Sequence, residues 1–189
     1  MPKTVAVNFE GIAPYSQSRK HDTPRKDRET WDDHELRTWR ERCWTNDKGE
    51  ILLPAMALKQ ALDAIAKRLG DQIPGRGKRT YTKAFVSGVI CEEDVVLKGC
   101  FKENCPSILI NANPDGQRGS GKRVPKTFPQ WPKWAGVARF VIMDDSVTKE
   151  VFERYFAEAG RFVGVGRFRP ENGGMNGRFH PLGFEWREL

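Results

Sequence analysis

The stretch LPAMALKQALDAIAKRLG, residues 53–70, is the clearest structural element in the sequence. Its apolar residues recur at helical spacing and fall on one stripe, which comprises Leu58, Ala61, Leu62, Ile65 and Leu69. Pro54 suits the first turn of a helix, and Gly70 suits the position just after the last turn. The stretch therefore predicts an amphipathic helix whose apolar stripe faces the core.

Upstream of this helix, the chain begins with an alternating pattern. In KTVAVNFEGIAP, residues 3–14, Val5, Val7 and Phe9 alternate with smaller or polar residues. Such alternation predicts a strand with one buried face, and the glycine and proline that follow predict its end.

Residues 15–50 are crowded with charged side chains and are predicted to form a long insertion after the first strand. Leu36, Trp39 and Cys43 stand at helical spacing within it and predict a short packed helix. The insertion is otherwise too polar for a core.

Downstream of the first helix, the sequence alternates between apolar runs and breakers. Three runs, residues 84–97, 107–112 and 134–145, predict strands. Residues 114–133 are rich in glycine, proline and lysine and predict a long basic loop.

The last third of the chain predicts a second helix and a final strand. SVTKEVFERYFAEAG, residues 146–160, has Ser146 as its expected N-cap. Its apolar face comprises Val151, Phe152, Tyr155, Phe156 and Ala159. RFHPLGFEWREL, residues 178–189, predicts the closing strand.

Reduced to its main elements, the predicted order is strand, helix, strands, strand, helix, strand. This is the βαββαβ plan of a ferredoxin-like or RRM-like domain, an α+β fold with helices on one face of an antiparallel sheet. At 189 residues, the chain is predicted to form a single domain, 1–189.

The formal net charge of +7 favours a polyanionic partner. The apolar runs are too short for a membrane span, and no signal peptide is apparent. The four cysteines form no CxxC pair, so reduced thiols in a cytoplasmic protein are expected. Neither a metal nor another cofactor is predicted.

Two segments resemble nucleotide-binding motifs, but each lacks a residue that its motif requires. GVGRFR has Arg169 at the third glycine position of a dinucleotide fingerprint and follows a helix instead of opening one. PGRGKRT has Arg79 where a P-loop requires Ser or Thr. His21 beside Asp22 is a weak candidate for acid–base catalysis, although a solvated loop histidine is the favoured interpretation. An enzyme is therefore the less favoured class.

Residues 160–178 combine repeated glycines with arginines in what is predicted to be a glycine-rich loop before the last strand. Glycine permits close backbone approach, and arginine binds phosphate oxygens through two donors. Exposed amides of such a loop would add donors for an anion. The loop predicts nucleic-acid binding through Gly164, Gly166, Arg167, Arg169, Gly173, Gly174 and Arg178. A second basic loop, which contains Arg76, Lys78 and Arg79, is expected to contribute.

The glycine-rich loop, in this position, resembles the signature of the RAMP superfamily, the RNA-binding proteins of CRISPR systems. The start of the first helix is similar to the corresponding pattern of that family, with matching residues at Leu53, Pro54, Ala55, Leu58 and Lys59. The resemblance covers about half of the chain and implies a Cas backbone subunit, which binds guide RNA beside copies of itself or other Cas-like subunits.

The resemblance also implies where the RNA is contacted. It implies a first RNA-contacting loop at Arg19 and Lys20 and a contribution from Lys59. It further implies that residues 114–133 act as a thumb, with contacts from Arg118, Lys122, Arg123 and Lys126.

Other functions remain open at this stage. Some family members cleave RNA, so a RAMP-type endoribonuclease is one alternative. A Cas-mimicking interaction protein is another, because Trp31, Trp39 and Trp44 are residues that anchor interfaces or fill cores. A phage single-stranded DNA-binding protein and a stand-alone or mobile-element-encoded relative are further alternatives.

Overall fold

The computed structural model describes residues 2–113 and 123–188. Its main sheet has four antiparallel strands, in the order β4 (Val89–Cys91), β8 (Ala135–Ile142), β1 (Lys3–Gly11) and β9 (Phe179–Glu188). Along the chain, α2 (Ala55–Leu69) lies between β1 and β4, and α4 (Lys149–Glu158) lies between β8 and β9. This is the ferredoxin-like order, so the predicted α+β class and βαββαβ plan are confirmed.

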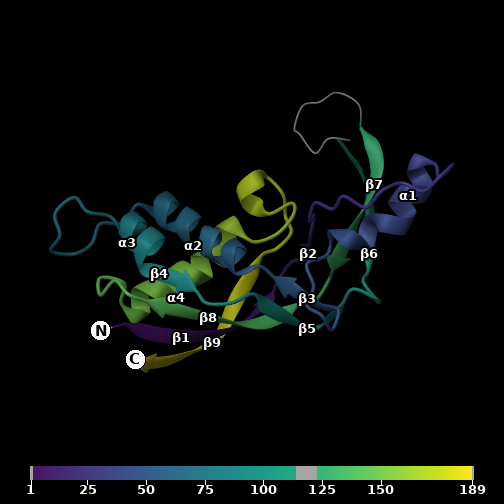
Figure 1. Cartoon of the computed structure of the whole chain (residues 1–189). Helices are drawn as coiled ribbons and strands as arrows, with labels where there is room; N and C mark the ends of the chain where they lie inside the picture. The colour runs from purple at the N-terminus through teal and green to yellow at the C-terminus, as the bar shows by residue number, and fades with distance from the viewer. Residues whose placement is uncertain (1, 114–122, 189) are drawn as a thin grey trace.

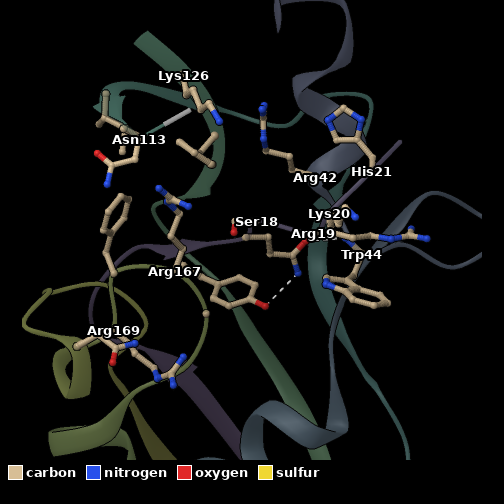
Figure 2. Close-up of a pocket in the computed structure, with 18 of the residues that line it drawn as sticks. Ser18, Arg19, Lys20, His21, Arg42, Trp44, Asn113, Lys126, Arg167 and Arg169 are labelled. Atoms are coloured by element: carbon tan, nitrogen blue, oxygen red, sulfur yellow. Dashed lines mark hydrogen bonds between the residues drawn. The ribbon is translucent and has the colours of Figure 1, made fainter. Parts of the chain in front are cut away.

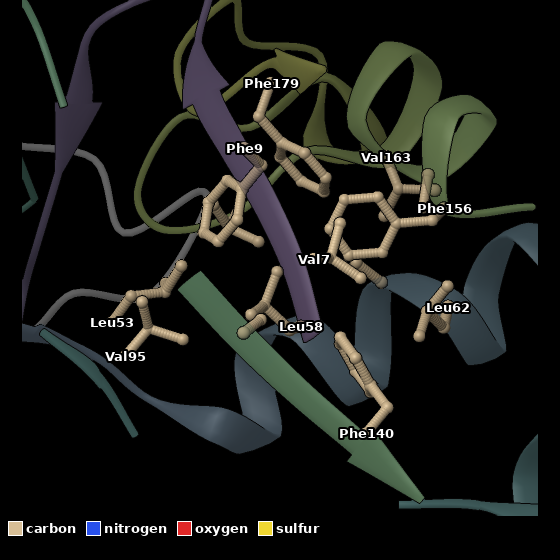
Figure 3. Packing of buried hydrophobic residues seen from close by; sticks show 14 of the residues in the cluster. Val7, Phe9, Leu53, Leu58, Leu62, Val95, Phe140, Phe156, Val163 and Phe179 are labelled. Atoms are coloured by element: carbon tan, nitrogen blue, oxygen red, sulfur yellow. The ribbon is translucent and has the colours of Figure 1, made fainter. Parts of the chain in front are cut away.

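The helices α2, α3 (Tyr81–Gly88) and α4 lie on one side of the main sheet (Figure 1). As the alternation predicts, Val5, Val7 and Phe9 of β1 are buried on the side that faces the helices. Figure 3 shows Val7 and Phe9 among side chains from the neighbouring strands and helices. Full burial of such side chains stabilises the fold by about 1.5–3 kcal/mol each.

An aromatic cluster fixes the two ends of the glycine-rich loop. Phe156 of α4 contacts Phe179, the first residue of β9, with ring centroids 5.2 Å apart. Phe9 of β1 contacts both rings, at 6.0 and 5.6 Å. The loop between α4 and β9 is therefore anchored to the core where it leaves the helix and where it enters the strand.

Two smaller sheets extend the domain beyond the main sheet (Figure 1). One contains β2 (Tyr15–Ser16), β7 (Val124–Trp131) and β6 (Ser107–Ala112), in that order. The other pairs β3 (Glu50–Leu53) with β5 (Val95–Phe101). The antiparallel strands β6 and β7 project from the rest of the molecule, beside α1 (Trp31–Thr38).

The predicted insertion, 15–50, is folded against β7. Its α1 and the short helix η1 (Trp39–Arg42) are joined by an ion pair in which Arg42 donates to both carboxylate oxygens of Glu35, at 2.9 and 2.8 Å. The Thr127 amide also donates to Glu35, at 2.8 Å, and Arg42 donates to the Thr127 carbonyl, at 2.9 Å. We call this set the Glu35 latch.

Four local predictions were wrong. Residues 84–88 belong to α3 and not to a strand, because the helical spacing of buried residues begins upstream, at Tyr81. Residues 124–131 of the predicted loop form β7, whose prolines are tolerated because β2 pairs with this strand only at Gln130 and Trp131. Thr148, not Ser146, caps α4, and Leu36 is 66% exposed instead of packed.

Candidate nucleic-acid interface

A groove of about 1050 Å³ separates the glycine-rich loop from the insertion and from the β6–β7 pair. Figure 2 shows the side chains that enter it from these segments. Seven of its lining residues are cations, namely Arg19, Lys20, Arg42, Arg123, Lys126, Arg167 and Arg169. The described residues that line it include no carboxylate. The groove therefore attracts anions, and its seven cations suit a chain of anionic groups better than a single ion.

Arg167 lies at the centre of this groove (Figure 2). Its Cζ atom lies 3.6 Å from the centroid of the Phe128 ring and 4.5 Å from that of Phe168. Its Nε donor is buried and has no hydrogen-bond partner within the described part of the chain. A buried donor without an acceptor costs free energy, so this geometry is suited to an acceptor that a ligand brings.

The electrostatic setting of Arg167 is unfavourable in the free protein. Burial, and secondly repulsion from the Arg42 guanidinium, lower the pKa of Arg167 from its usual value. Arg42 is held by the Glu35 latch, whereas no ion pair is recorded for Arg167 among the described residues. Both guanidinium groups contact Phe128, since the Arg42 Cζ atom is also within 5.0 Å of its ring centroid.

Two glycines of the loop allow its backbone to pack closely against neighbouring atoms. Gly166 has φ +76°, and a Cβ there would lie 2.5 Å from both the Ser16 carbonyl oxygen and the Tyr15 ring. A Cβ at Gly174 would overlap the Phe168 carbonyl. These contacts hold the loop against β2 and against itself.

Most amides of the glycine-rich loop donate hydrogen bonds to carbonyls of the chain itself. The prediction that these amides offer donors to an anion is therefore corrected. The Arg167 amide donates to the Ser16 carbonyl at 2.8 Å, and the Gly177 amide donates to the Pro14 carbonyl at 2.7 Å. The amides of Gly173 and Gly174 donate to carbonyls within the loop. Side chains, not these amides, therefore supply the donors that face the groove.

Phe168 has a left-handed backbone, with φ +58°, which is unusual for an aromatic residue. A conformation of this kind costs about 1–3 kcal/mol and persists only where neighbouring contacts impose it. Here the Phe168 carbonyl accepts a hydrogen bond from the Asn176 amide at 3.0 Å. The ring lines the groove and is 38% exposed, whereas Phe179 is buried and Phe162 is partly buried against the core.

The structure brings only part of the predicted site together. Of the predicted nucleic-acid-binding residues, those that line the groove are Arg19, Lys20, Arg123, Lys126, Gly166, Arg167 and Arg169. Arg118 and Lys122 lie outside the described residues. Gly164, Gly173 and Gly174 shape the loop without lining the groove, and Arg178 donates to the Arg161 carbonyl at 3.1 Å.

Lys59 does not face the groove. Its ammonium group binds the Asp63 carboxylate and lies 3.2 Å from the carbonyls of Phe85 and Val86 at the end of α3. Lys59 therefore stabilises the contact between α2 and α3. Arg76, Lys78 and Arg79 lie in the loop that joins these helices, at the other end of the molecule from the β6–β7 pair (Figure 1).

Several residues that line the groove were not predicted from the sequence. Arg42 comes from η1, Phe128 comes from β7, and Tyr15 lies in β2. Trp44 lies just beyond η1, is 43% exposed, and has the Arg19 Cζ atom 4.8 Å from its ring centroid. No local motif marks these residues, because they meet only when the insertion packs on β7.

His21 lines the groove, whereas Asp22 does not and is exposed. Burial and then repulsion from Arg42 lower the pKa of His21, so its imidazole is neutral at neutral pH.

The four cysteines are free thiols. The described residues contain no group of three or more side chains suited to a metal, and no helix among them is long and apolar enough to cross a membrane.

No protein-family model and no curated protein matches the sequence. Among solved structures, the chain is similar to Cmr6 from Pyrococcus furiosus, with a TM-score of 0.51 and 14% identity over 96% of this chain and 99% of that one. It is also similar to a chain of a Type III-B Cmr-beta complex bound to cognate target RNA, with a TM-score of 0.55 and 14% identity. That match covers 99% of this chain but 61% of the other. The chain therefore shares its fold with Cmr6 and with a component of a Cmr complex.

Proposed function

We propose that the protein binds single-stranded RNA in the groove, without cleaving it, as a Cas backbone-like subunit that holds guide RNA. The observation that carries this proposal is Arg167, a stacked guanidinium in a cationic groove, whose buried Nε donor has no partner among residues 2–113 and 123–188. A phosphate oxygen supplies the acceptor that this donor lacks, and a bound phosphate relieves the repulsion between Arg167 and Arg42.

The fold comparison supports RNA as the polyanion. A chain of similar fold comes from a Cmr complex bound to cognate target RNA. In the same proposal, copies of this protein or other Cas-like subunits lie side by side on one RNA. Light scattering of the protein titrated with RNAs of increasing length tests this assembly, because bound mass would rise in steps with RNA length.

The binding proposal is tested by fluorescence anisotropy with a labelled single-stranded RNA and the variants Arg167→Ala and Lys78→Ala. Loss of a charge-assisted hydrogen bond is worth about 1.5–3 kcal/mol, so Arg167→Ala should weaken binding about 10-fold to 100-fold. Lys78→Ala removes an equal charge outside the groove and is the matched control. Equal affinities for the parent and both variants would contradict the proposal, and competition with DNA of the same sequence separates RNA from single-stranded DNA binding.

His21 supports a second candidate function, an endoribonuclease. A neutral imidazole beside Arg42 in an RNA-binding groove is chemically suited to accept a proton from a ribose hydroxyl. Incubation of end-labelled RNA with the parent protein and with His21→Ala, each with and without magnesium, tests this candidate. Cleavage by the parent that is lost in His21→Ala would support this candidate. Intact RNA in every sample would contradict it and would leave RNA binding as the only proposed function.

A further inference from the structure

Two exposed aromatic rings line the groove, and they come from different segments. Phe168 lies in the glycine-rich loop and is 38% exposed, and Trp44 follows η1 and is 43% exposed. Each ring has an arginine over it, since the Cζ atom of Arg167 lies 4.5 Å from the Phe168 centroid and that of Arg19 lies 4.8 Å from the Trp44 centroid. The same pair of groups, a cation and an open ring, thus occurs twice in one groove.

An arginine over an exposed aromatic ring favours a ligand that has both a flat group and an anionic group. A guanidinium over one face of a ring leaves the opposite face as the stacking surface, while the guanidinium keeps its edge donors for an anion. A nucleotide brings a flat base and an adjacent phosphate, so it satisfies both groups. A polyanion without bases satisfies only the cations.

The backbone that carries each ring is held in place by contacts within the chain. Phe168 is held by the Asn176 hydrogen bond to its carbonyl and by the close approach of Gly174. The Trp44 amide donates to the Gln17 side-chain oxygen at 2.8 Å, and the Gln17 side chain also donates to the Leu52 carbonyl at 2.7 Å. Because the backbone at both residues is fixed before binding, less conformational freedom is lost when a base stacks on each ring.

We propose that Phe168 and Trp44 each stack on a nucleobase of the same bound strand. This inference rests on the proposed RNA binding and specifies its ligand as a strand with unpaired bases, because base pairing in a duplex keeps neighbouring bases stacked on one another. Arg167 and Arg19 contact the phosphates next to the two stacked bases.

The test uses the full chain and two ligands of equal length, a single-stranded RNA and the same strand with abasic sites along its central part. The variants are Phe168→Leu and Trp44→Leu. Trp31→Leu is the matched control, because Trp31 is 73% exposed, has the Arg25 Cζ atom 4.5 Å from its centroid, and does not line the groove. Circular dichroism and thermal unfolding verify that each variant is folded.

The parent should bind the intact RNA more tightly than the abasic strand. Phe168→Leu and Trp44→Leu should each lose about 5-fold or more in affinity for intact RNA, since stacking on an aromatic side chain is worth about 1–3 kcal/mol per base. Neither variant should lose affinity for the abasic strand, and Trp31→Leu should match the parent on both ligands.

If the parent bound intact and abasic strands equally, the stacking inference would be wrong. RNA binding itself would still stand in that case, provided that Arg167→Ala weakened binding of both strands. If Arg167→Ala also bound like the parent, the proposed function would fail together with the inference. The comparison of ligands on the parent protein does not depend on the folding of any variant.

Discussion

The Arg167 guanidinium, which stacks on rings and has no carboxylate partner in the described part of the chain, has opposite effects on folding and on binding. Stacking on Phe128 places the Arg167 guanidinium without neutralising it, and Arg42, which contacts the same ring, repels it. Burial of this cation beside Arg42 therefore costs the free protein stability that the ring contacts offset only in part. Residues of this kind are expected where stability has been exchanged for function.

Arg167→Met tests this exchange. The thioether side chain keeps apolar contact with the rings and removes the repulsion and the unpartnered donor, so the free energy of unfolding should stay equal or rise by about 1 kcal/mol. RNA affinity should fall as it does in Arg167→Ala. Chemical denaturation and anisotropy measure the two quantities, and a clear loss of stability would show that Arg167 is a structural residue.

At the scale of elements, the Glu35 latch connects α1, η1 and β7, and thereby sets one wall of the groove. Burial raises the pKa of Glu35, but hydrogen bonds from Arg42 and from the Thr127 amide outweigh it, so the net pKa is lowered. A carboxyl group whose pKa is lower in the folded state contributes stability above its unfolded pKa. That contribution disappears as the pH falls through the folded value.

Glu35→Gln should therefore lower the free energy of unfolding at neutral pH by about 2–3 kcal/mol, the value of hydrogen bonds to a charged group. The difference between parent and variant should shrink as the pH falls below about 4.5 and should vanish once Glu35 is protonated in the folded parent. Urea titrations across this pH range measure it. A difference that is independent of pH would mean that shape, not charge, explains the effect.

The glycine-rich loop provides a second test at this scale, through a matched pair of glycines. Gly166 and Gly173 both have positive φ, at +76° and +79°, but only a Cβ at Gly166 would meet other atoms within 4 Å. Gly173→Ala should cost about 1–2 kcal/mol for the left-handed backbone alone. Gly166→Ala should cost about 1–3 kcal/mol more, because it also pushes the loop from β2. Equal losses, measured by thermal unfolding, would show that the loop is not packed on β2.

For the molecule as a whole, the binding of a polyanion should depend steeply on salt. The logarithm of the association constant should fall linearly with the logarithm of salt concentration, with a slope of about −0.7 for each phosphate contact to a single strand. Arg167→Ala should reduce the slope by about that amount, and Lys78→Ala should leave it unchanged. An unchanged slope in Arg167→Ala would mean that Arg167 does not neutralise a phosphate.

The sequence predicted elements whose pattern is local and missed those that depend on distant partners. The alternation of Val5, Val7 and Phe9 and the apolar stripe of α2 were sufficient to predict β1 and α2. β7 was missed because its prolines resemble those of a loop, and their tolerance depends on where β2 ends. Local patterns therefore predicted the ferredoxin-like plan but not the extensions around it.

The same distinction applies to the groove. Arg167 and Arg169 were predicted because they stand within a glycine-rich segment, which is visible in the sequence. Arg42 and Trp44 were missed because they face the groove only after α1 and η1 pack on β7. Lys59 was wrongly included, since its role at the end of α3 becomes apparent only when α3 is recognised as a helix.

The position of β1 in the main sheet has a consequence for how the protein is made. β1 pairs with β8 on one side and with β9 on the other, so Lys3 is opposite Ile142 and Glu188. During synthesis, β1 therefore has neither of its neighbours until β8 has been translated, and it gains the second only when β9 follows. A stalled nascent chain that lacks β9 leaves one edge of β1 open to chaperones and to other unfinished chains.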